Sequence, residues 1–305
     1  MRFLLIDGHY YVYRSYHAIQ SLSNSRGEPT NAIFGFVKSV RKMLKDLQPD
    51  YAVVFWDEGL PVRRLSVQPS YKQQRQEMPA NMVPQLDFIR RFCPIMGLGS
   101  IGKPDTEADD LMACYVAAAT RDQIECVLAT NDKDLLQLAG QNVRIYSTNK
   151  ADLKHPQDPF VLLGEEEVTQ KWGVPPAAIP EVLALAGDAV DNIPGIDKVG
   201  PKTAASLIRE FGTVENLLCN LDKVTNANLR QKLAAGREQI ERNREMVRLE
   251  LHHEAEPPVA SFVLRPQYAE YIAGLERCEF RSLLKEVKEE AANTGTTQTQ
   301  QGELF

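Results

Sequence analysis

The sequence predicts an α/β domain with a mostly parallel central sheet and flanking helices, followed by a helical domain. In the first half, short apolar runs alternate with amphipathic helical periodicity, which is typical of parallel sheets with crossover helices. In the second half, helical patterns follow one another. The chain has 305 residues, of which 43% are hydrophobic and 25% charged. This balance is that of a soluble globular protein with a sizeable core.

Several classes of protein are excluded at the outset. No apolar stretch approaches the roughly 18 residues of a membrane span, and Asp7 interrupts the N-terminal apolar run too early for a signal peptide. The five cysteines are scattered and form no C-x-x-C pair, and the five histidines form no H-E-x-x-H pattern. A disulfide framework, a cysteine zinc site and a zinc protease are therefore not expected. We expect a cytoplasmic protein without a membrane partner.

In the first half, the apolar runs 2–6, 51–56, 124–129 and 142–147 predict buried strands. Residues 30–47 predict an amphipathic helix. Its apolar face carries Ile33, Val37, Val40, Leu44 and Leu47.

The second half begins after a Pro-, His- and Asp-containing linker, 152–159. Helices are expected at 165–172, 180–186, 204–211, 226–247 and 279–290. From Ala291 onward the polar composition predicts disorder. The expected domains are therefore 1–158 and 159–290, with a disordered tail at 291–305.

Three apolar strands run directly into an aspartate: Asp7, Asp57 and Asp132. Because ligands bind outside the carboxyl ends of parallel strands, these acids predict a pocket at one edge of the sheet. Taken singly, each is most simply a turn or cap residue. The prediction therefore depends on the whole set.

Further acids extend the set. Glu107, Asp109 and Asp110 open an apolar helix, although alone they could simply complement the helix dipole. Asp134 follows Asp132, and Asp188 and Asp191 lie in a G-D-A-V-D-N run. Crowded carboxylates repel one another unless cations lie among them, and hard oxygen ligands select Mg²⁺ or Mn²⁺ over zinc. Such a pocket suits two-metal phosphodiester hydrolysis.

Basic groups that could hold a phosphate lie in two segments. In the Y-K-Q-Q-R segment (71–75), Lys72 and Arg75 are at i and i+3, one face of a helical turn. A solvated surface helix is the alternative. Residues 195–203 form a glycine-bracketed turn that opens a helix, whose backbone N–H groups can bind a DNA phosphate. The alternative there is a tight helical hairpin with packing glycines.

The net charge of −6 does not exclude a nucleic-acid partner. Once the nine candidate site acids are set aside, basic residues outnumber the remaining acidic ones. Bound divalent cations would shift the balance further.

Five motifs resemble those of the 5′-nuclease (flap endonuclease) family, in family order. They are L-I-D-G (5–8), Y-K-Q-Q-R (71–75), E-A-D-D (107–110), T-N-D-K-D (130–134) and the run 187–204. The chain is especially similar to the 5′→3′ exonuclease domain at the N-terminus of bacterial DNA polymerase I. With no polymerase following, it resembles a stand-alone version. The resemblance implies a PIN-like sheet domain, a helical gateway at about 68–95 and a helix–three-turn–helix element at 187–211.

The resemblance also implies the site residues. One Mg²⁺, which Mn²⁺ can replace, would be held by Asp7, Asp57, Glu107, Asp109 and Asp110. A second would be held by Asp132, Asp134, Asp188 and Asp191, with Asp191 acting through water. The scissile phosphate would be contacted by Lys72, Arg75 and Arg14, and the DNA by Tyr71, Gly195, Lys198, Gly200, Lys202 and Thr203. A K⁺ ion is expected in the hairpin.

The sequence departs from the family pattern at three places. His9 and Tyr10 replace small polar residues after the first aspartate, and Val62-Arg63-Arg64 replaces Thr-Phe-Arg. Asn131 replaces a glycine before Asp132. Because Asn tolerates a left-handed conformation, we expect that turn to survive.

The function that follows is a Mg²⁺-dependent, structure-specific 5′ nuclease that acts on DNA with 5′ flaps, nicks or 5′ ends. It would leave a 5′-phosphate and a 3′-hydroxyl, and would serve RNA-primer removal and DNA repair as a nucleoid-associated monomer. A related single-strand ribonuclease would lack the 187–204 hairpin. A non-catalytic junction-binding protein would keep the hairpin and lose acids.

The C-terminal residues suggest a protein partner. The polar stretch 291–300 leads to Gln301, Leu304 and Phe305, which resemble the bacterial sliding-clamp binding motif. Chance, or docking of the tail onto the body, is the alternative.

Overall fold

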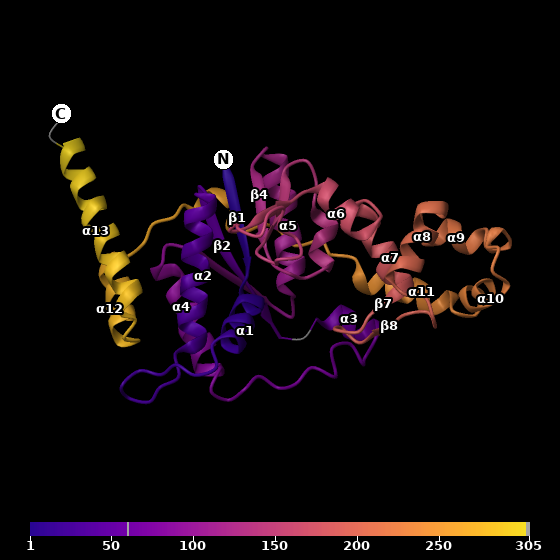
Figure 1. Ribbon diagram of the computed structural model, residues 1–305, viewed down its shortest axis with the longest axis horizontal. Helices are drawn as coiled ribbons and strands as arrows, with labels where there is room; N and C mark the ends of the chain where they lie inside the picture. Colours follow the sequence, from indigo (N-terminus) through magenta and orange to yellow (C-terminus); the bar gives the residue numbers. More distant parts are fainter. Residues whose placement is uncertain (60, 303–305) are drawn as a thin grey trace. The chain divides into compact units, whose positions relative to one another are not determined.

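The computed structural model describes residues 1–59 and 61–302, with side chains up to residue 293. It forms two compact units, each built from separate segments (Figure 1). The first comprises Met1–Trp56, Glu77–Ile101 and the chain from Pro257. The second comprises Asp57–Gln76 and Gly102–Glu256, so the domain boundary expected near residue 158 falls inside it.

The first unit is built on a parallel strand pair, β1 (Arg2–Asp7) and β2 (Tyr51–Glu58). The last two residues of β2, Asp57 and Glu58, belong to the second unit. Phe3 lies opposite Tyr51 and Asp7 opposite Phe55. The apolar residues of both strands are fully buried, which confirms the strands expected at 2–6 and 51–56.

Helices surround this pair. The α1 helix begins after Asp7, whose Oδ1 accepts a hydrogen bond from Tyr10 N at 3.0 Å. A Cβ at Gly8 would lie 2.4 Å from the Trp56 ring, so only glycine fits there. The helices and the strand that leads into the second unit are α1 (Gly8–Ala18), α2 (Asn31–Leu47), α4 (Val83–Ile95), β3 (Gly99–Pro104), η4 (Val259–Phe262), α12 (Tyr268–Arg277) and α13 (Arg281–Gly302).

The C-terminal helices pack onto earlier ones. On α12, Tyr271 meets Phe92 of α4 edge to face, with ring centroids 5.3 Å apart. On α13, Glu286 and Glu290 bind Arg41 of α2 at 3.0 and 2.6 Å. The α13 helix continues to Gly302, which differs from the disorder expected from Ala291. Ala291 and Ala292 are good helix formers and extend a helix that is already anchored.

The second unit contains β4 (Glu125–Ala129) and β5 (Val143–Ser147), which pair in parallel, and β6 (Val161–Leu163), which pairs antiparallel with β5. The first two strands were expected. The sequence did not reveal β6, which has three residues, or β3, which contains two glycines and no apolar run.

The helices of the second unit follow the sequence prediction closely, except that the run expected at 226–247 is interrupted at Gly236. A Cβ at Gly236 would lie 2.4 Å from the Ile196 side chain. None of the described helices is long and apolar enough to cross a membrane. The helices are α3 (Val62–Val67), α5 (Ala108–Arg121), η1 (Asp134–Leu138), α6 (Glu165–Trp172), η2 (Pro176–Ala178), α7 (Ile179–Ala186), α8 (Pro201–Phe211), α9 (Val214–Cys219), η3 (Leu221–Lys223), α10 (Ala227–Ala235) and α11 (Arg237–Val247).

A short antiparallel hairpin joins α7 to α8. Its strands are β7 (Gly187–Asp188) and β8 (Ile193–Pro194). Gly187 has φ +73°, and a Cβ there would lie 2.2 Å from Gly195 N. A Cβ at Gly195 would lie 2.0 Å from Ala186 O. These two glycines therefore allow the backbones to close, and the hairpin carries Asp188 at the end of β7 and Asp191 in its loop.

Candidate active site

Carboxylates from four parts of the chain gather in the second unit, each at the end of a helix or strand. Asp57 ends β2, and the first turn of α5 follows Glu107. The loop after β4 and the β7–β8 hairpin supply the others. The candidate site acids in this unit are Asp57, Glu107, Asp109, Asp110, Asp132, Asp134, Asp188 and Asp191.

Three of these acids form what we call the Asp134 cluster. Asp134, Asp188 and Asp191 each offer a carboxylate oxygen, and these oxygens all lie within 4.8 Å of one another. The three residues are 9%, 3% and 5% exposed. The buried Oδ1 of Asp134 has no hydrogen-bond partner among the described residues. Burial, followed by the charges of Asp132, Asp191 and Asp188, raises the pKa of Asp134 well above its usual range.

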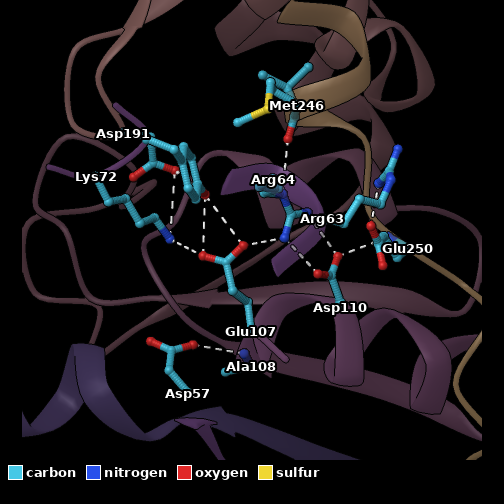
Figure 2. A network of polar contacts seen from close by, with 12 residues as sticks. Asp57, Arg63, Arg64, Lys72, Glu107, Ala108, Asp110, Asp191, Met246 and Glu250 are labelled. Atoms are coloured by element: carbon cyan, nitrogen blue, oxygen red, sulfur yellow. Dashed lines mark hydrogen bonds and ion pairs between the residues drawn. The ribbon is translucent and has the colours of Figure 1, made fainter. Parts of the chain in front are cut away.

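Two other acids form what we call the Arg64 cluster. The Arg64 guanidinium donates to both oxygens of Asp110, at 2.6 and 2.9 Å, and to Glu107 (Figure 2). It also donates to the backbone oxygens of Met246 and Arg248, at 3.1 and 3.3 Å. Burial alone would lower the pKa of Arg64, but Asp110 and Glu107 raise it. The chain itself thus compensates the charge of these carboxylates.

Tyr71 connects the two clusters. Its hydroxyl lies 3.2 Å from Glu107 Oε1 and 3.1 Å from Asp191 Oδ2, and the side chain is 5% exposed. In the structure the Tyr71 side chain is enclosed by protein, and its expected contact with DNA stays a prediction. A tyrosine that precedes a lysine in a polar segment gives no indication in the sequence that its side chain is buried.

Lys72 and Arg75 converge on the same carboxylates. Lys72 Nζ binds Glu107 and lies 3.8 Å from Asp191, and Arg75 binds Asp191 at 2.8 Å. Burial alone would lower the pKa of Lys72, but Glu107 and Asp191 raise it, so the amine is protonated. The expected helical turn is wrong: Lys72 has φ +54°, and Arg75 N bonds Lys72 O at 3.0 Å in a non-helical turn.

Amide side chains fix this turn to the β7–β8 loop. Gln68 Nε2 donates to Asn192 O at 2.6 Å, and Asn192 Nδ2 donates to Ser70 O at 2.6 Å. Gln74 Nε2 reaches Ala189 O and Val190 O at 3.1 and 3.0 Å. The cationic turn and the β7–β8 hairpin that carries Asp188 and Asp191 therefore form one hydrogen-bonded assembly. The sequence prediction missed these residues, since isolated amides form no recognisable pattern.

The remaining acids of the unit cap or shape local structure. Asp57 Oδ1 accepts from Ala108 N at 2.8 Å, at the start of α5 (Figure 2). Asp132 Oδ1 accepts from Asp134 N at 2.9 Å, and Thr130 Oγ1 accepts from Asp132 N at 3.0 Å. These bonds hold the turn that was expected to survive the replacement of glycine by Asn131, and Asn131 has no left-handed φ. Asp109 is half-buried.

Lys133 and Arg63 also bind acids of this unit. Lys133 binds Asp188 at 2.6 Å. Arg63, which replaces the usual aromatic residue, forms ion pairs with Glu245 at 3.2 Å and with Glu250. Of the adjacent arginines 63 and 64, only the second is buried, and nothing local in the sequence distinguishes them.

Asp7 and Arg14 belong to the first unit. Asp7 is 9% exposed and caps α1. Arg14 is exposed on α1 and lies over the Tyr11 ring, 5.8 Å from its centroid. His9 meets Trp56 edge to face at 5.6 Å, and Tyr10 meets Tyr11 at 5.0 Å. The bulky residues after Asp7 are thus accommodated by packing on aromatic neighbours.

The start of α8 presents the expected phosphate-binding groups. Lys198 is exposed with φ +63°, and Gly200 precedes the helix without a side-chain cap. Lys202 and Thr203 are exposed in the first turn. Their backbone N–H groups have no intrahelical partner, as at any helix start. Leu304 and Phe305 lie outside the described residues, as does the side chain of Gln301.

The fold and the carboxylate-rich site define the class of the protein as a hydrolase of phosphodiesters. Two family models match the chain: a 5′-3′ exonuclease N-terminal resolvase-like domain over residues 2–173, and a 5′-3′ exonuclease C-terminal SAM fold over residues 174–270. The chain belongs to the 5′-3′ exonuclease family and is a nuclease. Its fold is accordingly a mostly parallel sheet with flanking helices, followed by a helical domain, as the sequence predicted.

Similar proteins include both separate and fused nucleases. A 5′-3′ exonuclease of Aquifex aeolicus is 35% identical, over 93% of this chain and 94% of that protein. A thermostable DNA polymerase I of Thermus thermophilus is 37% identical over 93% of this chain, which spans only 33% of the polymerase.

Solved structures share the fold at lower identity. The T5 D15 flap endonuclease, in a pseudo-enzyme–product complex with DNA and metal ions, has a TM-score of 0.66 and 20% identity, covering 95% of this chain and 98% of that one. The catalytic core of Rad2 in complex with DNA substrate has a TM-score of 0.63 and 17% identity, covering 94% and 90%. Another T5 5′-exonuclease structure holds zinc, so related nucleases bind divalent metal ions.

Proposed function

We propose that this protein is a Mg²⁺-dependent, structure-specific 5′ nuclease that cleaves one phosphodiester where a 5′ flap or 5′ end meets duplex DNA. One observation carries the proposal. The buried Oδ1 of Asp134 is unpartnered within the described part of the chain, and Asp188 and Asp191 offer oxygens beside it. An all-oxygen, negatively charged set of this kind fits a hard divalent cation.

The residues divide between two candidate metal positions. Asp132, Asp134, Asp188 and Asp191 would hold one Mg²⁺, and Asp7, Asp57, Glu107, Asp109 and Asp110 the other, with Mn²⁺ able to substitute. Bound metal ions supply an activated water and stabilise the leaving oxygen. The K⁺ ion in the hairpin stays a prediction from family resemblance.

The chain's own cations act on the phosphate. Lys72 and Arg75 are held on Glu107 and Asp191 in the structure, within reach of the Asp134 cluster. On substrate binding they would exchange a carboxylate for the scissile phosphate and stabilise its developing charge. Arg14 would contribute a third contact. Arg64 would instead keep Glu107 and Asp110 in place.

The α8 start would hold the duplex beside the cleavage site. Lys198, Lys202 and the exposed backbone N–H groups suit phosphate contacts that do not read sequence. We expect Lys202→Ala to weaken duplex binding and to reduce its salt slope by about one phosphate contact. Binding isotherms at several salt concentrations test this, and an unchanged slope would place the contact elsewhere.

The T5 flap endonuclease and Rad2 structures are complexes with DNA, which supports the same substrate class for this chain. The cellular task would be removal of RNA primers and repair of flaps near the bacterial nucleoid, by a monomer. Single-strand ribonuclease activity, or junction binding without cleavage, is the competing function.

Cleavage of end-labelled flap, nicked and single-stranded substrates with Mg²⁺ and with EDTA tests the proposal. We expect cutting at the flap junction, with 5′-phosphate and 3′-hydroxyl ends, only with Mg²⁺. Preferential cutting of single-stranded RNA would support the ribonuclease. Flap binding without cleavage would support the junction-binding protein.

The tail adds a proposed partner, the bacterial sliding clamp, through Gln301, Leu304 and Phe305. A short linear motif that orders on binding gives micromolar-range affinity and raises the local concentration of the nuclease on DNA. Truncation after Thr299 should leave cleavage of naked flap DNA unchanged and abolish stimulation by a loaded clamp. Identical clamp responses of the two forms would refute the interaction.

A further inference from the structure

A second group of potential metal ligands lies outside the acidic site, in the segment that follows α11. Glu250, His252 and His253 each offer a donor atom, and these atoms all lie within 4.8 Å of one another. Glu250 and His253 are half-buried and His252 is exposed, so solvent ions can reach the group. The proposed cleavage reaction uses none of these three side chains.

The geometry of the group suits a small ion. His252 Nε2 lies 3.3 Å from Glu250 Oε2, and the two imidazole centroids are 4.3 Å apart. Zinc binds imidazole nitrogen and carboxylate oxygen at about 2.0–2.2 Å, so small side-chain rotations bring all three donors onto one ion. A cavity of about 310 Å³ beside the group, lined by Arg63, Arg248, Leu249, Glu250 and His252, leaves room for water ligands.

The donor chemistry separates this group from the Asp134 cluster. Two imidazoles and one carboxylate favour Zn²⁺ and similar transition-metal ions, whereas carboxylates alone favour Mg²⁺. Burial and the neighbouring His252 lower the pKa of His253. A neutral imidazole is the form that binds a metal.

Glu250 is also joined to the Arg64 cluster. Its backbone N–H donates to Asp110 Oδ1 at 2.8 Å, and its carboxylate binds Arg63 (Figure 2). The backbone oxygens of Met246 and Arg248, in the same segment, accept hydrogen bonds from Arg64. An ion that draws the Glu250 side chain away from Arg63 would therefore disturb the contacts that position Asp110.

We propose that Glu250, His252 and His253 form a binding site for a transition-metal dication such as Zn²⁺, and that its occupation lowers nuclease activity through Asp110. The fourth position on the ion would be filled by water. The inhibitory part rests on the proposed nuclease function, whereas the binding part does not.

Calorimetric titration of the full chain with Zn²⁺, in excess Mg²⁺, tests the binding part. The variants are a His252→Ala/His253→Ala double variant and a His155→Ala control, which removes an exposed histidine elsewhere. We expect the wild type and the control to bind one more Zn²⁺ than the double variant. Loss of a residue that only hydrogen-bonds to a metal ligand typically weakens metal affinity 10–100-fold. Loss of two ligands should therefore lower the Zn²⁺ affinity of this site about 100-fold or more. Equal stoichiometry and affinity in all three proteins would overturn the proposal.

NMR of the histidine side chains gives a readout that needs no variant. Zn²⁺ should shift the imidazole signals of His252 and His253 in the wild type and leave that of His155 in place. Shifts that do not involve the two adjacent histidines would overturn the site.

The inhibitory part is measured by flap cleavage in Mg²⁺ with increasing Zn²⁺. Any Zn²⁺ that enters the acidic site would inhibit all three proteins equally, so only the difference between them is informative. We expect the double variant to need about tenfold more Zn²⁺ for half-inhibition. Equal inhibition would overturn the coupling. Failure of every protein to cleave would instead contradict the proposed nuclease function, while the titration would still decide the binding site.

Discussion

The Arg64 cluster and the Asp134 cluster are both buried sets of carboxylates in the same unit, yet their charges are compensated in different ways. In the first, one guanidinium donates to both oxygens of Asp110 and to Glu107. In the second, Asp134 Oδ1 is left without a partner in the part of the chain that the structure describes. Lys133 and Arg75 bind Asp188 and Asp191, so within the described residues it is Asp134 Oδ1 that the proposed metal ion would have to compensate.

Under the proposed function, this difference separates a cluster that stabilises the fold from a cluster that binds metal. A buried carboxylate destabilises the folded state unless it is paired. Removing one member of a buried ion pair therefore leaves an uncompensated charge in the folded protein. Variants in the Arg64 cluster should therefore change stability first. Variants in the Asp134 cluster should remove activity while leaving the metal-free fold as stable as before, or more so.

The largest effect is expected for Asp134→Asn. The variant keeps the shape of the side chain and removes the charge that would bind a metal. Cleavage of flap DNA should fall on the order of 10,000-fold, or more than 5 kcal/mol, while flap binding in Ca²⁺ stays close to wild type. Single-turnover assays and binding isotherms measure the two quantities.

Asp222→Asn, at an exposed carboxylate on η3, is the matched control and should cleave normally. Near-normal turnover of Asp134→Asn would show that Asp134 is not a metal ligand.

The next effect is on stability. Arg64→Leu removes one partner of a buried ion pair and leaves Glu107 and Asp110 without the guanidinium. The free energy of unfolding should fall by about 3–5 kcal/mol. Arg63→Leu, at the exposed neighbour, should cost less than about 1 kcal/mol. Chemical denaturation of both variants measures the contrast, and equal losses would contradict the assignment of Arg64 as the buried compensating charge.

A smaller effect is expected where the clusters meet. Lys72→Ala removes a protonated amine that lies on Glu107 and near Asp191, so the chemical step should slow about 100-fold, or about 2.7 kcal/mol. Lys285→Ala, on the exposed face of α13, is the control. If single-turnover rates stay normal and only substrate affinity changes, Lys72 acts as a tether and has no role in the chemical step.

The smallest effect is on the metal-free protein. With a chelator present at pH 8, the free energy of unfolding of Asp134→Asn should be about 1 kcal/mol higher than that of the wild type. The reason is that the variant lacks a buried carboxylate whose pKa is raised. The wild-type carboxyl takes up its proton in the folded state at a higher pH than in the unfolded state. As the pH falls, that proton removes the penalty, and the gap between the two proteins should close. A gap that widens toward low pH would contradict the raised pKa of Asp134.

The sequence alone determined the features that depend on local periodicity. The strands at 2–6 and 51–56 and the helix at 31–47 follow from apolar spacing, and all are present. The same reasoning placed acids at the ends of strands and helices, because topology sends those ends to one edge of a sheet.

Only the tertiary structure decided how the charged groups pair. It buried Arg64 and left Arg63 half-exposed, it enclosed Tyr71, and it brought Arg75 to Asp191 through a turn with no helical pattern. These outcomes depend on contacts between residues that are dozens to more than a hundred positions apart. The energy of a buried charge is set by the few atoms around it, and those atoms are assembled only when the chain has folded.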